Sequence, residues 1–544
     1  MLQAREDYAR TCQDFSWTIP AHYNIGTDVC DRWADGSGRL ALIVDRGDSP
    51  PDRYTFDQLK RWSDELALAL RARGVEPGDR VGILLPQSLE TALSHLAVYK
   101  LGAIAVPLFT LFGTDALQYR LGNSGARALV THTEGMGKIA AIRDALPELR
   151  CVLNIDAARQ DENAFWGAIE SQQGNVLTPH DTLADDPAVI IYTSGTTGKP
   201  KGALHAHRML LGHLPGVEIS HNFFPDRARL MWTPADWAWI GGLMDVLMPS
   251  WHHGVAVLAH RFGKFDAEQA WRLMARHQVS HTFLPPTALK MLRALDAPER
   301  YGALRLVSVA SGGETLGAQL IDWGRKTLGV TINEFYGQTE CNMIVSSCSA
   351  LFEPRAGAMG RPVPGHDVRI IDERGQVVPD GTEGHIAVRR PDPVMFLQYW
   401  ANPRATADAF IGEFLVTGDR GMRDADGYLW FKGRGDDVIT SAGYRIGPGP
   451  IEDCLISHPA VRMAAVIGVP DPERTEIVKA CIVLKEGFQP SAALIAEIQD
   501  HVRRRAAAHE YPRLIEFMDA LPMTTTGKVI RKALRDLHQQ HPAS

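Results

Sequence analysis

An apolar strand that runs directly into a loop of glycine, hydroxyl and lysine residues constrains this chain most. Residues 188–191 are Ala-Val-Ile-Ile, and residues 192–202 read Tyr-Thr-Ser-Gly-Thr-Thr-Gly-Lys-Pro-Lys-Gly. Glycines let a backbone approach an anion closely, and hydroxyls and lysines supply the donors that a polyphosphate needs. The loop differs from a Walker A loop because only two residues separate Gly195 from Gly198 and a proline follows the first lysine. The segment therefore predicts a phosphate-binding loop at the end of a sheet strand.

The length and charge of the chain narrow its class. A chain of 544 residues is expected to form more than one domain. A composition of 45% hydrophobic and 22% charged residues is typical of a globular enzyme. Its 57 Lys and Arg against 64 Asp and Glu give a net charge of −7. We therefore expect no bulk attraction for nucleic acid or for an anionic membrane surface.

The cysteines and the apolar runs indicate a cellular location. The seven cysteines are scattered and form no CxxC pair, which favours reduced thiols over a disulfide framework. The first residues carry acids and no apolar core of a signal peptide, and no apolar run is long enough to span a bilayer. These features predict a cytoplasmic protein without an integral membrane segment.

Strand and helix signals alternate along the first part of the chain. Apolar residues recur at helical spacing over 56–74, a β-rich run covers 80–85, Ser88 caps a helix that Gly102 ends, and 103–107 is another strand. A strand, helix and strand of this length imply parallel pairing. Further strands are expected near 128–131, 151–155, 189–192, 306–310 and 331–335. Doubly wound sheets of this kind bind ligands at the carboxyl ends of their strands.

Two later regions differ from this pattern. Residues 360–390 combine short strands with turns, which predicts a smaller β subdomain. The charged, glycine-flanked stretch 433–437 precedes strands near 464–469 and 480–484 and a helix over about 491–507. We therefore predict an α/β protein with a large N-terminal domain of doubly wound sheets and a β subdomain at 1–432. A hinge follows at 433–437, and a small α+β domain at 438–544.

Six motifs in this order resemble those of the adenylate-forming superfamily, which contains acyl-CoA synthetases, luciferases and the adenylation domains of peptide synthetases. They lie at 192–202, 311–315, 336–340, 417–419, 433–446 and 526–528. The resemblance covers nearly the whole chain and is strongest to the acetyl-CoA and medium-chain acyl-CoA synthetase branch. It implies a ligase that uses ATP and Mg²⁺ to form an acyl-adenylate, passes the acyl group to coenzyme A and releases AMP. It also implies that the small domain moves between these two steps.

The resemblance assigns a role to individual residues. For ATP and AMP it implies Thr193, Ser194, Gly195, Thr196, Thr197, Gly198, Lys199, Lys201, Gly313, Glu314, Thr315, Glu334, Phe335, Tyr336, Gln338, Thr339, Asp419, Arg434 and Lys528. For the metal it implies Glu340 and Thr196, for coenzyme A Gly443, Tyr444 and Arg445, and for the hinge Asp436.

The implied catalytic residues Lys528, Glu340 and Arg434 also suit their roles chemically. A carboxylate is a hard oxygen donor for Mg²⁺, and an arginine meets phosphate with two parallel hydrogen bonds. The acceptor-only carboxylate of Asp419 suits the two ribose hydroxyls. A lysine in a mobile segment can place positive charge over the α-phosphate as negative charge develops there.

The residues that match the acyl pocket of this branch are Trp239, Ile240, Gly241, Gly337 and Asn342. Acetate enzymes have a tryptophan at the position of Gly337 and a threonine at that of Gly241. Two glycines predict a deeper cavity and an acid larger than acetate, whether medium-chain, branched or aromatic, since each buried methylene adds about 0.8 kcal/mol. Alternatively, bulky residues such as Trp237 or Met343 refill the space. Asn342 stands where the family has a glycine, so a polar group in the pocket is also open.

Other functions and partners remain open at this point. An adenylating enzyme could load a carrier-protein thiol, for which a carrier partner is needed, and a non-catalytic nucleotide-binding regulator is a further alternative. Residues 522–528 resemble the recognition pattern of acetyltransferases that regulate acyl-CoA synthetases, which predicts a lysine acetyltransferase acting on Lys528. The histidines at 205, 207 and 213 have no cysteine or carboxylate beside them to complete a tetrahedral metal site, so none is expected there. The oligomeric state stays open.

Overall fold

The computed structural model describes the chain except for residues 48, 194–198, 435–436, 438, 442–443, 472–473, 506–510, 525–527 and 541–544. The chain divides into two compact units. The N-terminal unit comprises Met1–Val368 and Arg389–Glu413, and the C-terminal unit comprises Arg369–Val388 and Phe414–Ser544. This division groups strands of the predicted β subdomain with the C-terminal region, unlike the predicted boundary at 433–437. The assignment of a hinge to that stretch stays a prediction, and Asp436 lies outside the described residues.

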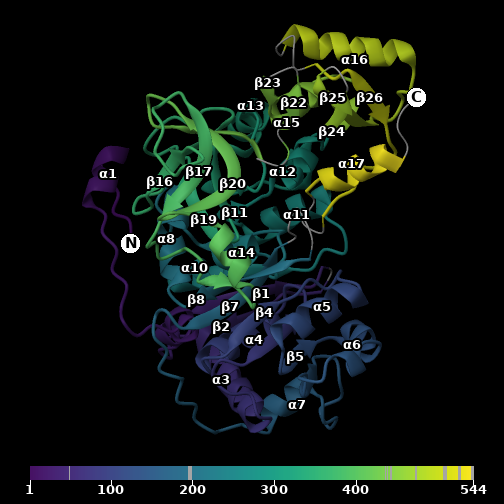
Figure 1. The fold of residues 1–544 in the computed structure, drawn as a ribbon. Helices are drawn as coiled ribbons and strands as arrows, with labels where there is room; N and C mark the ends of the chain where they lie inside the picture. Colours follow the sequence, from purple (N-terminus) through teal and green to yellow (C-terminus); the bar gives the residue numbers. More distant parts are fainter. Residues whose placement is uncertain are drawn as a thin grey trace. The chain divides into compact units, whose positions relative to one another are not determined.

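One layer of the N-terminal unit is a seven-stranded sheet with the order β18-β8-β7-β4-β3-β5-β6 (Figure 1). The strands are β18 (Gln398–Tyr399), β8 (Lys201–Ala206), β7 (Pro187–Thr193), β4 (Ile104–Pro107), β3 (Arg80–Leu84), β5 (Ala128–Thr131) and β6 (Cys151–Asn154). The predicted parallel pairing of 80–85 with 103–107 is confirmed, because β3 and β4 run parallel. The hairpin of β7 and β8 is antiparallel and places the glycine-rich loop at its end.

Helices accompany this sheet with the predicted boundaries. Helix α3 (Phe56–Ala72) starts with a capping box between Thr55 and Gln58. Helix α4 (Leu89–Lys100) is capped by Ser88, whose Oγ accepts from the Thr91 N–H at 3.2 Å, and Gly102 follows the helix with φ +68°. The other helices in this part are α1 (Tyr8–Asp14), α2 (Ile25–Val29), α5 (Thr114–Ser124), α6 (Thr133–Ala140) and α7 (Phe165–Glu170).

The second sheet of the N-terminal unit has the order β15-β14-β13-β12-β11-β9-β10-β1-β2. Its strands are β15 (Ala358–Pro362), β14 (Cys341–Ser346), β13 (Ile332–Gln338), β12 (Ser308–Gly312), β11 (His281–Phe283), β9 (Leu230–Trp232), β10 (Ala256–His260), β1 (Leu40–Asp45) and β2 (Asp52–Thr55). The strands from β13 to β1 run parallel, while β14, β15 and β2 are antiparallel to their neighbours.

The helices associated with this second sheet include short π-helical segments. The helices are α8 (Met209–Ser220), α9 (Ile240–Gly242), α10 (Met248–His252), α11 (Ala267–His277), α12 (Pro286–Arg293) and α13 (Ala318–Trp323), whereas α14 (Pro403–Asp408) lies against β18 of the first sheet. A π-helical segment over Leu243–Leu247 joins α9 to α10, and another follows α13 at Gly324–Leu328. Large side chains such as Trp232, Trp251 and Phe283 are fully buried in the core of this unit.

The C-terminal unit contains two sheets. The first has the order β16-β17-β20-β21, from β16 (Val368–Ile371), β17 (Glu383–Arg389), β20 (Phe414–Arg423) and β21 (Leu429–Arg434). The second has the order β23-β22-β25-β24, with β26 also paired to β25. Its strands are β22 (Ile439–Ser441), β23 (Tyr444–Ile446), β24 (Val461–Asp471), β25 (Thr475–Leu484) and β26 (Leu514–Phe517).

The long strand β24 shows how this second sheet acquires two apolar faces. Its Val466 packs with α15 (Pro448–Ile456) and α16 (Ala492–Arg505), whereas its neighbour Ile467 packs with Leu534 of α17 (Arg531–Gln540). Successive side chains of a strand alternate between the faces of a sheet, so helices cover both sides. Figure 1 shows α16 and α17 on opposite sides of this sheet. The predicted strands and helix of the small α+β domain are therefore present.

These elements confirm the predicted fold class, an α/β protein of doubly wound sheets with a β subdomain and a small α+β region. Over the described ranges, no helix combines the length and the apolar character that a membrane crossing requires.

Candidate active site

The glycine-rich loop closes the hairpin of β7 and β8. Thr193 of β7 is paired with Lys201 of β8, so these two residues hold the ends of the loop together. On its C-terminal side, the Tyr119 hydroxyl of α5 donates to the Pro200 carbonyl at 2.9 Å, and Lys199 Nζ lies 5.5 Å from the centre of the Tyr119 ring. Helix α5 thus fixes the end of the loop. The predicted residues Ser194, Gly195, Thr196, Thr197 and Gly198 lie outside the described residues.

Glu340 lies in a tight turn between β13 and β14. Gln338 is paired with Cys341, which leaves Thr339 and Glu340 as the two turn residues. The Glu340 main-chain carbonyl accepts from the Phe396 N–H at 2.8 Å. This hydrogen bond therefore holds the turn to the segment that precedes β18 and fixes the main chain from which the Glu340 side chain extends.

Tyr399 joins the glycine-rich loop to Glu340. Its hydroxyl donates to Glu340 Oε1 at 2.6 Å, and its ring centre lies 5.0 Å from Lys201 Nζ. Tyr399 was not predicted from the sequence, because it stands 59 residues from Glu340 and in no motif. The pairing of β18 with β8, which sets Tyr399 opposite Ala203, is what brings it to the site.

The turn after β12 has a shape that only glycine permits. Gly312 lies beside Phe335 of β13, and a Cβ atom on Gly312 would be 2.5 Å from the Phe335 ring. Gly313 has φ +99°, in the left-handed region that favours glycine. The Leu316 N–H donates to Glu334 Oε2 at 3.1 Å and fixes the far side of the turn. Gly312 and the Phe335 ring are both buried here, so the glycine allows the main chain of β12 to lie against the ring.

The remaining predicted nucleotide residues of this unit stand around the same two strands. Glu314 Oε2 lies 3.9 Å from Lys290 Nζ of α12, and Glu334 is buried within β13. Thr315, Tyr336, Gln338 and Thr339 are half-buried along the turn and the end of β13. The structure thus brings the predicted residues of the 311–315 and 336–340 motifs together at the carboxyl ends of β12 and β13.

The predicted acyl-pocket residue Gly241 lies against a row of aromatic rings. Its Cβ position would be 2.9 Å from the Trp239 ring and 3.0 Å from the Phe283 ring. The centres of the Trp239 and Phe283 rings are 5.6 Å apart, and those of Phe283 and Phe335 are 5.2 Å apart. Ile240 is buried beside Gly241 in α9. Phe283, at the end of β11, was not predicted from the sequence, and no motif marks it.

Gly337 is enclosed by the main chain of the neighbouring strand. A Cβ atom there would be 2.3 Å from the Met343 nitrogen and 2.7 Å from Asn342 Cα. The space next to both glycines is therefore filled, by rings at Gly241 and by the backbone of β14 at Gly337. The predicted deeper cavity is therefore not found next to these two glycines. The alternative prediction, in which other residues refill the space, fits both positions better. Met343 is among the residues nearest to Gly337, whereas Trp237 is not among those nearest to either glycine.

Asn342 places a polar group beside Gly337. Its Oδ1 atom lies 2.8 Å from the Cβ position of Gly337, and its Nδ2 donates to Asp245 Oδ1 at 2.5 Å. Burial raises the pKa of the Asp245 carboxyl well above its usual range, while the Asn342 hydrogen bond lowers it.

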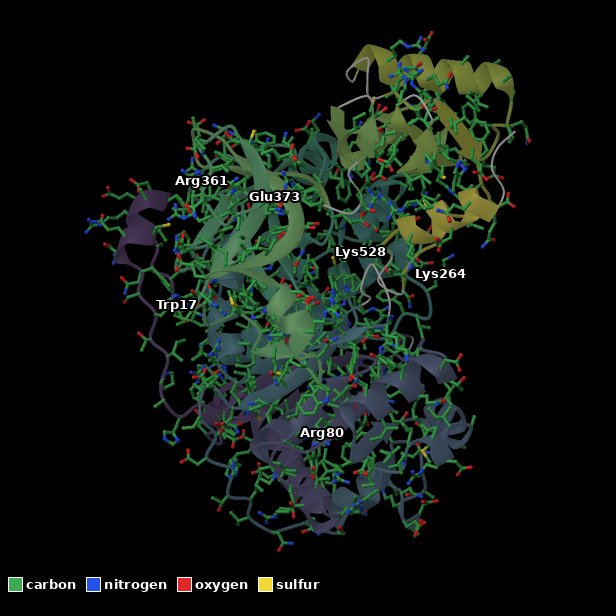
Figure 2. The ribbon with its side chains drawn as sticks, viewed as in Figure 1. Trp17, Arg80, Lys264, Arg361, Glu373 and Lys528 are labelled. Atoms are coloured by element: carbon green, nitrogen blue, oxygen red, sulfur yellow. The ribbon has the colours of Figure 1, made fainter. Side chains whose placement is uncertain are left out.

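The C-terminal unit carries the other predicted residues. Asp419 is buried in β20, with Arg434 of β21 as its paired neighbour. Lys528 lies just before α17, in the segment labelled in Figure 2, and its side chain is exposed. Its N–H donates to Thr524 Oγ1 at 3.0 Å, and the Thr524 N–H donates to the Lys528 carbonyl at 2.7 Å. Gly443 and the side chains of Arg434, Tyr444 and Arg445 lie outside the described residues.

Comparison with known proteins identifies this arrangement. Residues 30–400 match the model of the AMP-binding enzymes, and residues 450–528 match that of the AMP-binding enzyme C-terminal domain. The chain belongs to the AMP-binding enzyme family. Acyl-coenzyme A synthetase ACSM4, mitochondrial, of Rattus norvegicus is 35% identical over 536 residues, which are 95% of this chain and 91% of the relative. Acetyl-coenzyme A synthetase of Bacillus subtilis (strain 168) is 34% identical, over 99% of this chain and 96% of the relative.

A solved structure agrees with these relatives. The anthranilate CoA ligase AuaEII in complex with anthranoyl-AMP superposes with a TM-score of 0.87 at 32% identity, over 97% of this chain and 99% of that one. This AMP-binding enzyme is thus an AMP-forming acyl-CoA synthetase, an acid–thiol ligase that uses ATP, Mg²⁺ and coenzyme A. The predicted superfamily and enzyme class are confirmed. The Glu340 carboxylate is an oxygen donor of the kind that Mg²⁺ prefers.

Proposed function

We propose that this acyl-CoA synthetase activates a carboxylic acid larger than acetate, of medium-chain, branched or aromatic type. The observation that supports the first step is the bridge from Lys201 through Tyr399 to Glu340, because it joins the phosphate loop to a metal-binding carboxylate. The observation that supports a larger acid is the row of rings at Trp239, Phe283 and Phe335, which offers an apolar wall rather than a small polar one.

In the first step the acid's carboxylate attacks the α-phosphorus of ATP, and pyrophosphate leaves. Lys199, Lys201 and the main chain and hydroxyls of 193–198 would bind the phosphates. Glu340 and Thr196 would hold Mg²⁺, which when bound neutralises phosphate charge. Lys528 would stabilise the charge that develops at the α-phosphate.

The nucleotide would be held by residues from several motifs. The turn at Gly313, Glu314 and Thr315 and the strand through Glu334, Phe335 and Tyr336 would surround the adenine, with Gln338 and Thr339 near the phosphate. Asp419, a buried acceptor in β20, would accept from both ribose hydroxyls. Arg434, its neighbour across β21, would bind a phosphate or the ribose beside it.

In the second step the thiol of coenzyme A attacks the acyl carbon, the bond to the phosphate oxygen breaks, and AMP leaves. Rotation of the small domain about Asp436 would withdraw Lys528 and present Gly443, Tyr444 and Arg445 to the pantetheine arm. Loading of a carrier-protein thiol is the alternative for this step. The mitochondrial ACSM4 relative and the anthranilate CoA ligase carry coenzyme A in their names, which supports coenzyme A as the acceptor of the acyl group.

An acid panel tests this function. Purified protein with ATP and Mg²⁺ is given acetate, butyrate, hexanoate, isobutyrate or benzoate, and pyrophosphate release and acyl-CoA formation are measured separately. We expect a higher kcat/KM for one of the larger acids than for acetate. Acetate as the best substrate would contradict the proposed acid class, and thioester formation on a carrier protein but not on coenzyme A would contradict the proposed acceptor.

We also propose that acetylation of Lys528 switches the first step off, because it removes the charge that the step needs. The exposed side chain of Lys528 in its short turn supports access by a lysine acetyltransferase. Mass spectrometry after incubation with such an enzyme identifies the modified lysine. Full adenylation activity of the stoichiometrically acetylated protein would contradict this proposal.

A further inference from the structure

The helix that follows Lys528 has few apolar contacts with the rest of the C-terminal unit. All ten residues of α17 are described, and Leu534 is the one among them that is buried. Leu534 shares a core cluster with Ile467 of β24 and Val483 of β25, whereas Leu537 of the same helix is 42% exposed. A helix in a folded protein is stabilised mainly by the packing of its apolar face. One buried side chain is a narrow apolar contact, so other interactions must fix the direction of α17.

Two arginines of α17 supply such interactions, and both reach Asp437. Arg535 Nη1 and Nη2 each donate to Asp437 Oδ1 at 3.0 Å, and Arg531 Nη1 donates to Asp437 Oδ2 at 3.4 Å. Asp437 is 8% exposed, and the side chains of Arg531 and Arg535 are 22% and 29% exposed. These pairs are therefore shielded from water, unlike the exposed ion pairs whose contribution to stability is small.

Arg531 extends this network to a second helix. Its Nη2 donates to both carboxylate oxygens of Glu452 in α15, each at 2.8 Å. Glu452 Oε1 in turn accepts from the Val466 N–H of β24 at 2.8 Å. Hydrogen bonds between an arginine and a carboxylate fix orientation as well as distance. The first turn of α17 is thus held to Asp437, to α15 and to β24.

The segment that carries Lys528 continues directly into α17. Met523 and Val529 form an antiparallel bridge across the two arms of a short hairpin, and Val529 follows Lys528 in the chain. Lys528 lies three residues before Arg531, the first residue of α17 (Figure 2). The direction of the helix therefore determines where the Lys528 side chain is presented.

Asp437 connects the same helix to the predicted hinge. It is the last residue of the stretch 433–437 and follows Asp436 in the chain. A cation that has to arrive at the α-phosphate by rotation needs a rigid connection to the point of rotation, because small errors in direction there become displacements at the reacting atoms. The ion pairs at Asp437 provide this connection.

We propose that Arg531 and Arg535 are positioning residues for adenylate formation, because by binding Asp437 they fix α17, and with it Lys528, to the end of the predicted hinge. The inference rests on the proposed function, in which Lys528 is the cation of the first step, and it adds the side chains that place this cation.

The two half-reactions should depend differently on this connection. Tyr444 and Arg445, which we propose for coenzyme A, lie in β23, and main-chain pairing with β22 holds this strand. That pairing does not require the arginines of α17. Loosening α17 should therefore slow the first step and spare the second.

Arg535→Met tests this difference, since methionine keeps an unbranched apolar side chain and the helix propensity but removes the guanidinium. We expect adenylate formation, measured as pyrophosphate release by the full chain, to fall roughly tenfold, because a displacement of about 1 Å can cost up to 100-fold. Thioester formation from preformed acyl-adenylate should stay within about twofold of the parent, because Lys528 takes no part in it.

Matched variants assign the loss to the ion pair. Arg535→Lys should recover part of the rate, because an ammonium still pairs with Asp437 but without the two parallel hydrogen bonds. Arg503→Met removes an arginine of α16 that pairs with Asp500 at 2.8 Å in the same unit, and it should leave both half-reactions unchanged.

Asp437→Asn breaks the same ion pairs from the other side and serves if Arg535→Met folds poorly. It should also slow adenylate formation selectively. Adding Arg535→Met to Asp437→Asn should cost little more than either change alone, because residues in one network do not act additively.

Hydrogen exchange gives a readout that does not depend on activity. In Arg535→Met and Asp437→Asn we expect roughly tenfold faster exchange in the peptide that contains residues 522–530, with unchanged exchange in residues 464–469 of β24. A role of the arginines in the stability of the whole unit would instead accelerate both peptides together.

Equal losses in both half-reactions would overturn the inference, as would unchanged adenylate formation in Arg535→Met and Asp437→Asn. An undiminished first step in Lys528→Ala would contradict the proposed function instead. In that case, selectively faster exchange in residues 522–530 still supports the attachment of the Lys528 segment to Asp437, and unchanged exchange contradicts it.

Discussion

Tyr399 connects two parts of the proposed nucleotide site. Its hydroxyl holds Glu340 and its ring faces Lys201. A carboxylate that loses one fixed donor keeps its charge but also gains freedom to turn away from a metal. The geometry of the proposed metal site would therefore rest on a side chain that is not itself proposed to bind metal or phosphate.

Tyr399→Phe is expected to weaken the use of Mg²⁺. A hydrogen bond to a charged group contributes about 1.5–3 kcal/mol, so we expect a roughly tenfold higher Mg²⁺ concentration for half-maximal pyrophosphate release. Tyr8→Phe is the control, since its hydroxyl donates to the Pro362 carbonyl and not to Glu340. An unchanged Mg²⁺ dependence in Tyr399→Phe would show that this hydroxyl has no part in holding the metal ligand.

Lys528→Ala is expected to separate the two half-reactions. Removing a charge that stabilises a transition state lowers the rate of adenylate formation roughly 10²- to 10³-fold. Thioester formation from preformed acyl-adenylate should persist, since the proposed rotation withdraws the lysine before that step. Lys532→Ala, four residues on in α17, is the matched control. Equal losses in both half-reactions would remove Lys528 from its proposed role.

At the scale of elements, the hairpin of β13 and β14 carries residues predicted for both the nucleotide site and the acyl pocket. Gly337→Ala is expected to destabilise it, because the new Cβ would be 2.3 Å from the Met343 nitrogen. Overpacking of this kind costs about 1–3 kcal/mol, measured as a lower midpoint of urea unfolding.

Gly137→Ala supplies the control of opposite sign. Gly137 lies in α6 with no atom within 4 Å of its Cβ position, so alanine should stabilise that helix by up to about 1 kcal/mol. If the urea midpoint of Gly337→Ala equals that of the parent, the backbone of β14 moves aside at little cost in free energy. The glycine would then be required for the acid rather than for the hairpin.

Local sequence signals predicted where helices and strands begin and end. They could not predict which residues of other elements pack against them. Ser88 and Gly102 mark the two ends of α4 because capping and left-handed geometry depend on the residue itself. The filled space at Gly337 depends instead on Met343, a non-glycine residue with φ +56° in the next strand. The bond of Asp245 to Asn342 joins residues 97 apart. Motifs identify which residues take part in a site, while contacts across the fold decide what space they leave.

At the scale of the whole molecule, buried histidines make stability depend on pH. Burial lowers the pKa to about 3 for His95, His205 and His207 and to about 4 for His213 and His281. In the unfolded chain the histidine pKa is near its usual value of about 6.5. Below that pH the unfolded chain therefore binds more protons than the folded protein. Stability is therefore complete above pH 6.5 and is lost as the pH falls towards the folded values.

We expect a loss on the order of 7 kcal/mol in the free energy of unfolding between pH 7.5 and 5.5, since each of these five buried histidines contributes about 1.4 kcal/mol. Asp236, whose pKa burial raises to about 6, acts weakly in the opposite direction. Urea unfolding at the two pH values measures the loss. His207→Gln should reduce the pH dependence, because it removes one of these buried imidazoles. Equal stability at both pH values would contradict the assignment.

Asp436→Pro tests whether the C-terminal unit must reorient between the two steps. Proline fixes φ and would restrict a hinge that has to rotate. We expect adenylate formation to persist while acyl-CoA output falls sharply, measured as pyrophosphate release and acyl-CoA in the same reaction. Asp426→Pro would alter a different turn, between β20 and β21, and serves as a comparison. Normal overall turnover in Asp436→Pro would place the hinge elsewhere.

The turn that carries Glu340 has a consequence for how such an enzyme diversifies. Glu340, the proposed metal ligand, occupies the turn, while Asn342, which donates to Asp245, stands two residues on in β14. Substitutions along that strand can change which acid is chosen while the chemistry on ATP persists. A single residue inserted in the turn would instead displace Glu340 and Asn342 together. Directed evolution towards new acids should therefore accumulate point substitutions in β14 and the facing π-helical segment, and tolerate no change of length there.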